Sequence, residues 1–123
     1  MPELEGVELA AAVAEKVLGI ENYDNPDAKY PCYILRRYER EHEEIVILRS
    51  LHDRRVWSPL RSMSDAWEIL DAMVSRGWDY NVHKSWCVLT NHQSGEHRLG
   101  SGNSPGEAIC RVALAVVGNG ETE

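Results

Sequence analysis

Phenylalanine is absent from this chain of 123 residues, and four Trp and five Tyr supply the large aromatic side chains. Because indole and phenol rings each carry a polar atom, we expect most of these residues to find a hydrogen-bond partner or water. Long hydrophobic runs are also absent, since no segment approaches the roughly 18–20 apolar residues of a membrane span. The first residues, Met-Pro-Glu-Leu-Glu-Gly, lack the basic start and apolar core of a signal peptide. We therefore expect a cytoplasmic protein with no membrane partner.

Cysteine is scarce, with Cys32, Cys87 and Cys110 as its three occurrences. An odd number with no closely spaced pair argues against a disulfide framework and for a reducing compartment. Free cysteines are among the most buried residues in proteins. We expect all three to be small core residues rather than nucleophiles or ligands.

Metal-binding motifs are absent as well. His83, Cys87, His92 and His97 lie close together in the sequence, and in extended strands His83 and Cys87 would share a face. However, the chain contains no C-x-x-C, H-x-x-x-H or H-E-x-x-H pattern. A structural zinc site is therefore a minor alternative, and we expect no metal and no cofactor.

An excess of basic residues is also missing, because 20 Asp and Glu outnumber 13 Lys and Arg for a net charge of −7. Such a chain is repelled by a phosphate backbone, which disfavours general binding to DNA or RNA. Hydrophobic residues make up 43% and charged residues 27%, which is ordinary for a soluble globular protein. The length predicts one domain, residues 1–118, followed by a frayed acidic tail at 119–123.

The segment at 62–77 predicts a central helix. Its apolar residues recur at helical spacing, and we expect them to form one buried stripe: Met63, Ala66, Trp67, Leu70, Met73 and Val74. Ser62 stands at the N-cap with Asp65 three residues on, as in a capping box, and Gly77 supplies a left-handed end.

Other elements are predicted on both sides of this helix. A first helix at 2–18 ends at Gly19 and precedes a loop, and strands are expected at 32–40 and 44–51 with a short one near 56–57. Strands at 78–83, 85–90 and 96–100 follow. The last helix begins at Ser104-Pro105 with Glu107 completing its capping box, and ends at Gly118.

Apolar residues at both parities of the strand at 44–51 determine the expected architecture. Ile45 to Leu48 are uninterrupted, which indicates that both faces of the strand are covered. Short links between strands indicate antiparallel pairing. The sequence therefore predicts an α+β protein, a three-layer α/β/α sandwich with one mainly antiparallel sheet and the order α-β-β-(β)-α-β-β-β-α.

Four segments resemble a known family. They are E-L-A-A-A-V-A-E-K-V-L-G at 8–19, S-D-A-W-E-I-L at 64–70, S-W-C-V-L at 85–89 and S-P-G-E-A-I-C-R-V-A-L at 104–114. In this order and spacing, the chain resembles the phage ABA sandwich domain, a family of small proteins encoded by phages and prophages. The resemblance implies the sandwich fold and a bacterial host, but it implies no catalytic residues, because fold alone does not assign an activity.

Arginine is concentrated in one stretch, with seven Arg and no Lys from Arg36 to Arg61. Guanidinium groups bind carboxylate or phosphate in a bidentate manner, and neighbouring aromatic rings suit a nucleobase. The candidate residues for binding a small anion are Arg36, Arg49, Arg54, Arg55, Trp57 and Tyr38. The alternative is an ion-paired surface, because five acidic residues occupy the same stretch.

Catalytic constellations are weak. His52-Asp53 and Ser94 lack a third partner, and the segment at 100–105 does not match a phosphate-binding loop, so we expect a flexible connector there. We name no catalytic residue and expect a binding protein rather than an enzyme.

Three functional hypotheses follow. The first is a non-enzymatic accessory protein that binds, with sequestration of an anionic nucleotide-like signal in counter-defence as its specific form. A host-protein-binding or assembly module, including a homodimer through an exposed sheet edge, is the alternative. An enzyme that acts on a phosphorylated small molecule through His52 and Asp53 ranks last.

Overall fold

The computed structural model describes residues 4, 6–22, 32–37, 43–50 and 53–121. The elements are α1 (Gly6–Lys16), β1 (Glu21–Asn22), β2 (Cys32–Arg37), β3 (Glu43–Ser50), β4 (Asp53–Trp57), α2 (Met63–Ser75), β5 (Trp78–Val82), β6 (Trp86–Asn91), β7 (His97–Ser101) and α3 (Pro105–Glu121). Their order is the predicted one, with the two-residue strand β1 added in the segment expected to be a loop. Between Gly100 and Pro105, the expected connector is shorter than predicted because its first two residues complete β7.

The strands form two sheets. Sheet A has the order β1-β2-β3-β4 and sheet B the order β5-β6-β7. Pairing is parallel between β1 and β2 and antiparallel in the other described pairs. The α+β class, the sandwich arrangement and the mainly antiparallel pairing are therefore confirmed, whereas the expectation of one sheet between two helical layers is corrected to two sheets.

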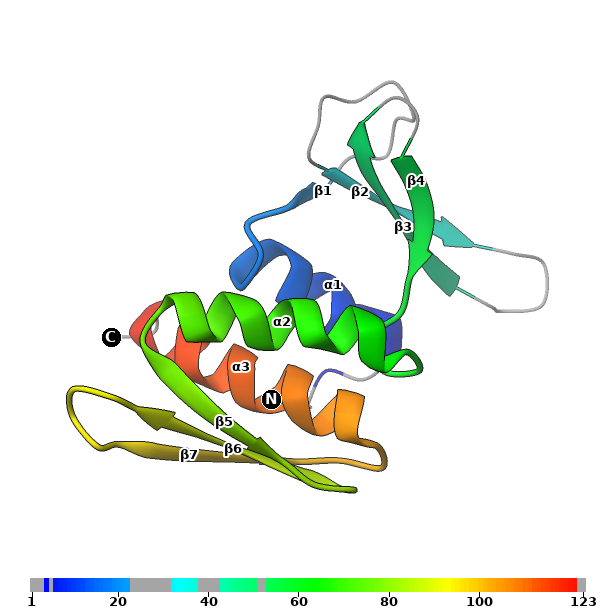
Figure 1. The fold of residues 1–123 in the computed structure, drawn as a ribbon. Coiled ribbons are helices and arrows are strands. Elements are labelled where there is room, and N and C mark those ends of the chain that lie inside the picture. Colours follow the sequence, from blue (N-terminus) through cyan, green and yellow to red (C-terminus); the bar gives the residue numbers. More distant parts are fainter. Residues whose placement is uncertain (1–3, 5, 23–31, 38–42, 51–52, 122–123) are drawn as a thin grey trace.

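The helices lie between the two sheets (Figure 1). Helix α1 contacts β3 of sheet A, α2 packs on β5, and α3 runs along β6 and β7 of sheet B. Helix α3 also contacts both other helices, so one helical layer joins the two sheets. The main core is continuous from Ile47 and Trp57 of sheet A, through the helices, to Cys87 and Leu89 of sheet B.

Strand β3 explains why the number of sheets could not be predicted. Ile45 and Ile47 belong to the main core beneath the helices, as the expected helical cover requires. Leu48 instead joins Cys32 and Ile34 in a separate small cluster on the other face of sheet A. Apolar residues on both faces of β3 correctly predict that both faces are covered. They do not predict which layer covers each face.

Helix α2 buries a narrower stripe than the one predicted. Its buried apolar residues are Ala66, Ile69, Leu70 and Met73. Met63, Trp67 and Val74 are instead 36%, 41% and 46% exposed, which corrects their assignment to the core. At 3.6 residues per turn, these three residues share a flank about 90° from the centre of the buried apolar face. They are exposed because α2 packs on the edge strand β5, which leaves one flank of the helix uncovered.

The predicted helix ends are correct in part. Gly19 and Gly77 have φ values of +69° and +91°, as the left-handed ends of α1 and α2 require. At the start of α3, the Glu107 N–H donates to Ser104 Oγ at 3.1 Å, and the Asn103 N–H donates to Glu107 Oε1 at 2.7 Å.

Two other helix ends differ from the prediction. Ser62 makes no side-chain capping bond at the start of α2. Its expected box partner, Asp65, is instead bonded to β4 and to the turn that follows it. Gly118 does not end α3, which continues to Glu121.

Candidate functional site

A buried carboxylate joins β4 to the start of α2. Asp65 is 4% exposed. Its Oδ1 accepts a hydrogen bond from Arg55 Nη1, and its Oδ2 accepts one from the Ser58 backbone N–H at 2.9 Å. Both oxygens of a costly buried charge are therefore satisfied, and the turn from β4 into α2 is fixed.

Glu68, one turn further along α2, completes this network. Its Oε1 accepts from Arg55 Nη2 at 2.7 Å and from Trp57 Nε1 at 3.1 Å. The hydrogen bond to Asp65 raises the pKa of the Arg55 guanidinium above its ordinary value, although burial acts in the opposite direction. Trp57 is 1% exposed, so the polar atom of this core indole has the partner that its burial requires.

The predicted anion-binding residues are therefore divided. Arg55 and Trp57 come together through Glu68, but both of them serve the joint between β4 and α2. Arg54 is exposed, and as the neighbour of Arg55 in a strand it points to the opposite face of sheet A. The two adjacent arginines therefore do not line one pocket.

The remaining candidate residues lie wholly or partly outside the part of the chain that the structure describes. Arg36 of β2 lies opposite Glu44 of β3 in the sheet, and Arg49 also lies in β3. The side chains of Arg36 and Arg49 are not among those that the structure describes. Tyr38 and His52 lie outside the described residues, as does the side chain of Asp53. The small-anion site stays a prediction.

Asp65→Asn is expected to lower the free energy of unfolding by about 2 kcal/mol, because an amide at this position places a donor against Arg55 or the Ser58 N–H. Equilibrium unfolding in urea measures the effect. Glu68→Gln is the matched control, since an amide oxygen can accept both bonds of Glu68, and it should cost less than about 1 kcal/mol. Equal losses in the two variants would contradict the assigned role of Asp65.

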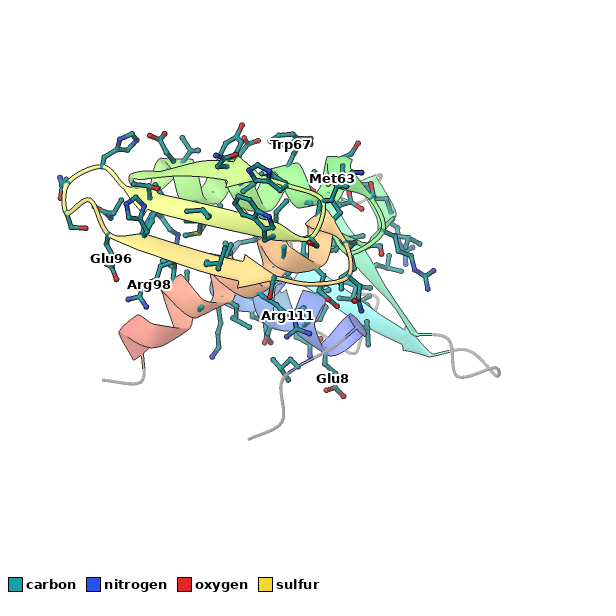
Figure 2. All side chains as sticks on the ribbon, turned by 90° about the horizontal axis from the view of Figure 1, so that it is seen from below. Glu8, Met63, Trp67, Glu96, Arg98 and Arg111 are labelled. Carbon is teal, nitrogen blue, oxygen red and sulfur yellow. The ribbon has the colours of Figure 1, made fainter. Side chains whose placement is uncertain are left out.

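Aromatic and apolar side chains gather beside the other flank of α2. Tyr80 on β5 is 42% exposed, and its ring meets Trp67 edge to face, with centroids 5.5 Å apart and planes at 67°. Met63 and Val74 flank Trp67 on the helix. We call these four residues, Met63, Trp67, Val74 and Tyr80, the α2–β5 surface. Figure 2 shows Met63 and Trp67 beside one margin of sheet B and Glu96 and Arg98 beside the other.

The outer face of sheet B carries a second, smaller apolar group. Trp86 is 37% exposed and stacks on His83, with centroids 3.6 Å apart. Leu99, opposite Val88 in the sheet, is 68% exposed. Because His83 stacks on Trp86, one face of the Trp86 ring is already covered within the chain.

The cysteines are free and buried, as expected. Burial raises the pKa of the Cys87 thiol to about 11 and that of Cys110 to about 12. Their thiolate fraction at neutral pH is therefore very small, and neither thiol is suited to nucleophilic attack.

Within the described part of the chain, no group of three or more His, Cys, Asp or Glu residues is placed to hold a metal ion. His83 and Cys87 do not lie in one strand. Cys87 is buried in β6 opposite Val82, whereas His83 precedes the strand and is exposed. The described helices also include none that is long and apolar enough to cross a membrane.

This arrangement defines a small α+β sandwich domain that exposes apolar surface. The chain belongs to the phage ABA sandwich domain family, whose model matches residues 11–114. The resemblance of the four sequence segments is therefore confirmed, and the protein is a member of a phage-associated family. No curated protein shows a significant match, and no solved structure does.

Sequence reasoning missed the α2–β5 surface because it assigned Met63, Trp67 and Val74 to the core and left out Ile69, which is fully buried. One signal was present. With Ile69 included, the apolar residues of α2 span more of the helix circumference than the roughly 100° stripe that a core-facing helix needs. The contact between Trp67 and Tyr80 joins different elements, and no local pattern predicts it.

Proposed function

We propose that this protein is a non-enzymatic accessory protein, encoded by a phage or prophage, that acts in the host cytoplasm by binding a host protein. One observation carries the proposal: Trp67 and Tyr80 are about two-fifths exposed and contact each other within a patch that also contains Met63 and Val74. Trp, Tyr and Met are enriched in protein interfaces, where a few aromatic residues supply most of the binding energy.

The geometry of the pair suits this role. The edge-to-face contact orients both rings before a partner arrives, so little side-chain entropy remains to be lost on binding. Helix α2 is anchored at its start by Asp65 and Glu68, which places the exposed flank on a rigid element. A rigid aromatic anchor with smaller apolar neighbours is typical of the centre of a protein interface.

A second candidate function is sequestration of a small anionic, nucleotide-like signal in counter-defence. The observation that favours it is Arg54, which is exposed and has no ion-pair partner among the described residues. Arg36 and Arg49 would be its further ligands. This candidate ranks second because the guanidinium of Arg55, its expected neighbour, is bonded to two carboxylates.

Affinity capture from the bacterial host tests the first candidate. Tagged wild-type protein should retain a defined host protein, and the double variant Trp67→Ala/Tyr80→Ala should lose it while keeping its melting temperature within a few degrees. Trp86→Ala is the matched control, because it removes a similarly exposed Trp outside the α2–β5 surface and should retain the partner. If every captured protein is retained by the double variant, the proposal is wrong.

Thermal melting with nucleotides and cyclic nucleotides tests the second candidate in parallel. A ligand-dependent rise in melting temperature that Arg54→Ala removes, with intact ligand recovered after denaturation, would support sequestration. A chemically altered ligand would indicate an enzyme instead. If no ligand shifts the melting temperature, the second candidate falls.

A further inference from the structure

The outer edge of β7 presents unpaired backbone groups. In sheet B the Gly102 N–H donates to the Ser85 carbonyl, and the Asn91 N–H donates to the Glu96 carbonyl. Because bonded and non-bonded pairs alternate in an antiparallel ladder, Arg98 and Gly100 also face β6. The backbone N–H and C=O groups of His97, Leu99 and Ser101 therefore point away from the sheet. Among the described residues, no strand pairs with them.

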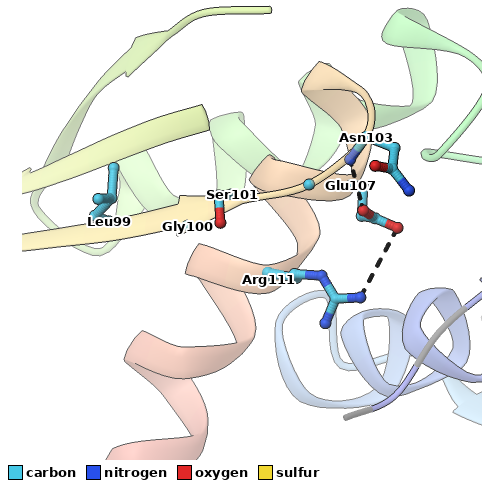
Figure 3. Close-up of a pocket in the computed structure, with 7 residues that line it drawn as sticks. Leu99, Gly100, Ser101, Asn103, Glu107 and Arg111 are labelled. Atoms are coloured by element: carbon cyan, nitrogen blue, oxygen red, sulfur yellow. Dashed lines mark hydrogen bonds and ion pairs between the residues drawn. The ribbon is translucent and has the colours of Figure 1, made fainter. Parts of the chain in front are cut away.

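An open groove runs beside this edge (Figure 3). It has a volume of about 380 Å³ and is lined by residues 99–103 on one side and by Glu107 and Arg111 of α3 on the other. The Glu107 carboxylate accepts the Asn103 N–H, so the row of outward-facing backbone groups stops at Ser101. The groove thus lies along a strand edge of defined length.

We propose that the β7 edge binds an extended peptide segment of a partner protein, which adds to sheet B as a fourth strand. Backbone groups at every second residue are the pattern that an extended chain complements. A side chain opposite Leu99 would lie on the outer face of the sheet beside this 68% exposed residue, so an apolar or β-branched residue fits there. Side chains of the opposite parity would enter the polar groove next to Glu107 and Arg111.

A second copy of this chain does not fit the same edge. Helix α3 lies directly over β7, since a methyl group placed on Gly100 would lie 2.6 Å from the Ala108 carbonyl oxygen. Two β7 strands paired at about 4.8 Å would bring their covering helices closer than the 8–10 Å that packed helices need. The net charge of −7 also opposes self-association and favours a segment with net positive charge.

This site lies at the edge of sheet B opposite to the α2–β5 surface. It does not depend on Trp67 or Tyr80, and either interaction can fail without the other. A partner that used both would be held at two separated points.

Amide hydrogen exchange measured by NMR tests the edge directly. In the free protein, the amides of Arg98, Gly100 and Gly102 should be protected, whereas those of Leu99 and Ser101 exchange rapidly. The probe is a 12-residue peptide selected on the immobilised protein from a displayed random library and then synthesised. Its addition should protect Leu99 and Ser101. Failure to select any peptide above an unrelated-protein control, or a bound peptide that leaves both amides unprotected, would overturn the proposal.

Proline provides the matched variants. Leu99→Pro removes an outward N–H without removing a bond to β6, a placement that edge strands tolerate. It should weaken peptide binding at least about tenfold relative to Leu99→Thr, which keeps the N–H. Ser101→Pro is the second variant if Leu99→Pro does not fold. Equal affinities of the proline and threonine variants would contradict strand addition, and concentration-dependent protection of Leu99 without peptide would assign the edge to a second copy instead.

Discussion

Trp57→Ala should lower the free energy of unfolding by about 4 kcal/mol, the largest loss expected for a single substitution in this chain. Trp57 is 1% exposed and belongs to the main core, where sheet A meets the helices. Truncation leaves a cavity, because the neighbouring elements cannot close over the volume of an indole. It also removes the Trp57 Nε1 donor from Glu68, although Arg55 still satisfies that carboxylate.

Two controls separate these contributions. Trp57→Phe keeps most of the ring and removes the N–H, so it should cost about 1–2 kcal/mol, of which the hydrogen bond accounts for about 1 kcal/mol. Trp67→Ala removes a Trp that is 41% exposed and should cost less than about 1.5 kcal/mol. Urea unfolding followed by circular dichroism measures all three. A loss for Trp57→Ala no larger than that for Trp67→Ala would show that Trp57 does not anchor sheet A to the helices.

Gly106→Ala is expected to cost about 3 kcal/mol, although alanine is the better helix former. A methyl group on Gly106 would collide with the backbone carbonyl oxygen of Pro59 and crowd Leu60. Both neighbours belong to the turn between β4 and α2, so relief of the collision would require α3 to move away from that turn.

Gly118→Ala is the matched control within the same helix. Nothing lies within 4 Å of a methyl group on Gly118, and the substitution should be neutral or stabilising by up to about 1 kcal/mol. The melting temperature of Gly106→Ala should therefore fall, whereas that of Gly118→Ala should rise or stay unchanged. Equal shifts would contradict the close approach of α3 to the turn.

The elements other than β1 were predictable because each has a local signal. The start of α3 is marked by Ser104, Pro105 and Glu107, because the side chains of Ser104 and Glu107 accept backbone N–H groups there. Gly19 and Gly77 mark helix ends through a conformation that glycine adopts readily. The family resemblance agreed with the sandwich class that the strand pattern had already predicted, and the family match supports it.

The number of sheets and the position of exposed surface depended on non-local contacts. Asp65 has the spacing of a capping residue, but its partners, Arg55 and Ser58, lie in the preceding strand and turn. Trp67 has the spacing of a core residue, but α2 lies on an edge strand that cannot cover its flank. A periodic pattern states which residues share a face of a helix, and the packing of other elements decides whether that face is buried.

The candidate site was predicted less well than the fold. The concentration of arginines from Arg36 to Arg61 is visible in the sequence. The role that the structure describes for one of them is structural, because Arg55 bonds two carboxylates of α2. Strand alternation then separates Arg54 from Arg55. A cluster in sequence is therefore divided between two faces of a sheet.

Isothermal titration of the purified host partner against wild-type and variant protein tests the central claim most directly. If the α2–β5 surface is the interface, Trp67→Ala/Tyr80→Ala should weaken binding about a hundredfold, while Trp86→Ala stays within about twofold of the wild type. An unchanged affinity of the folded double variant for that partner would contradict the claim.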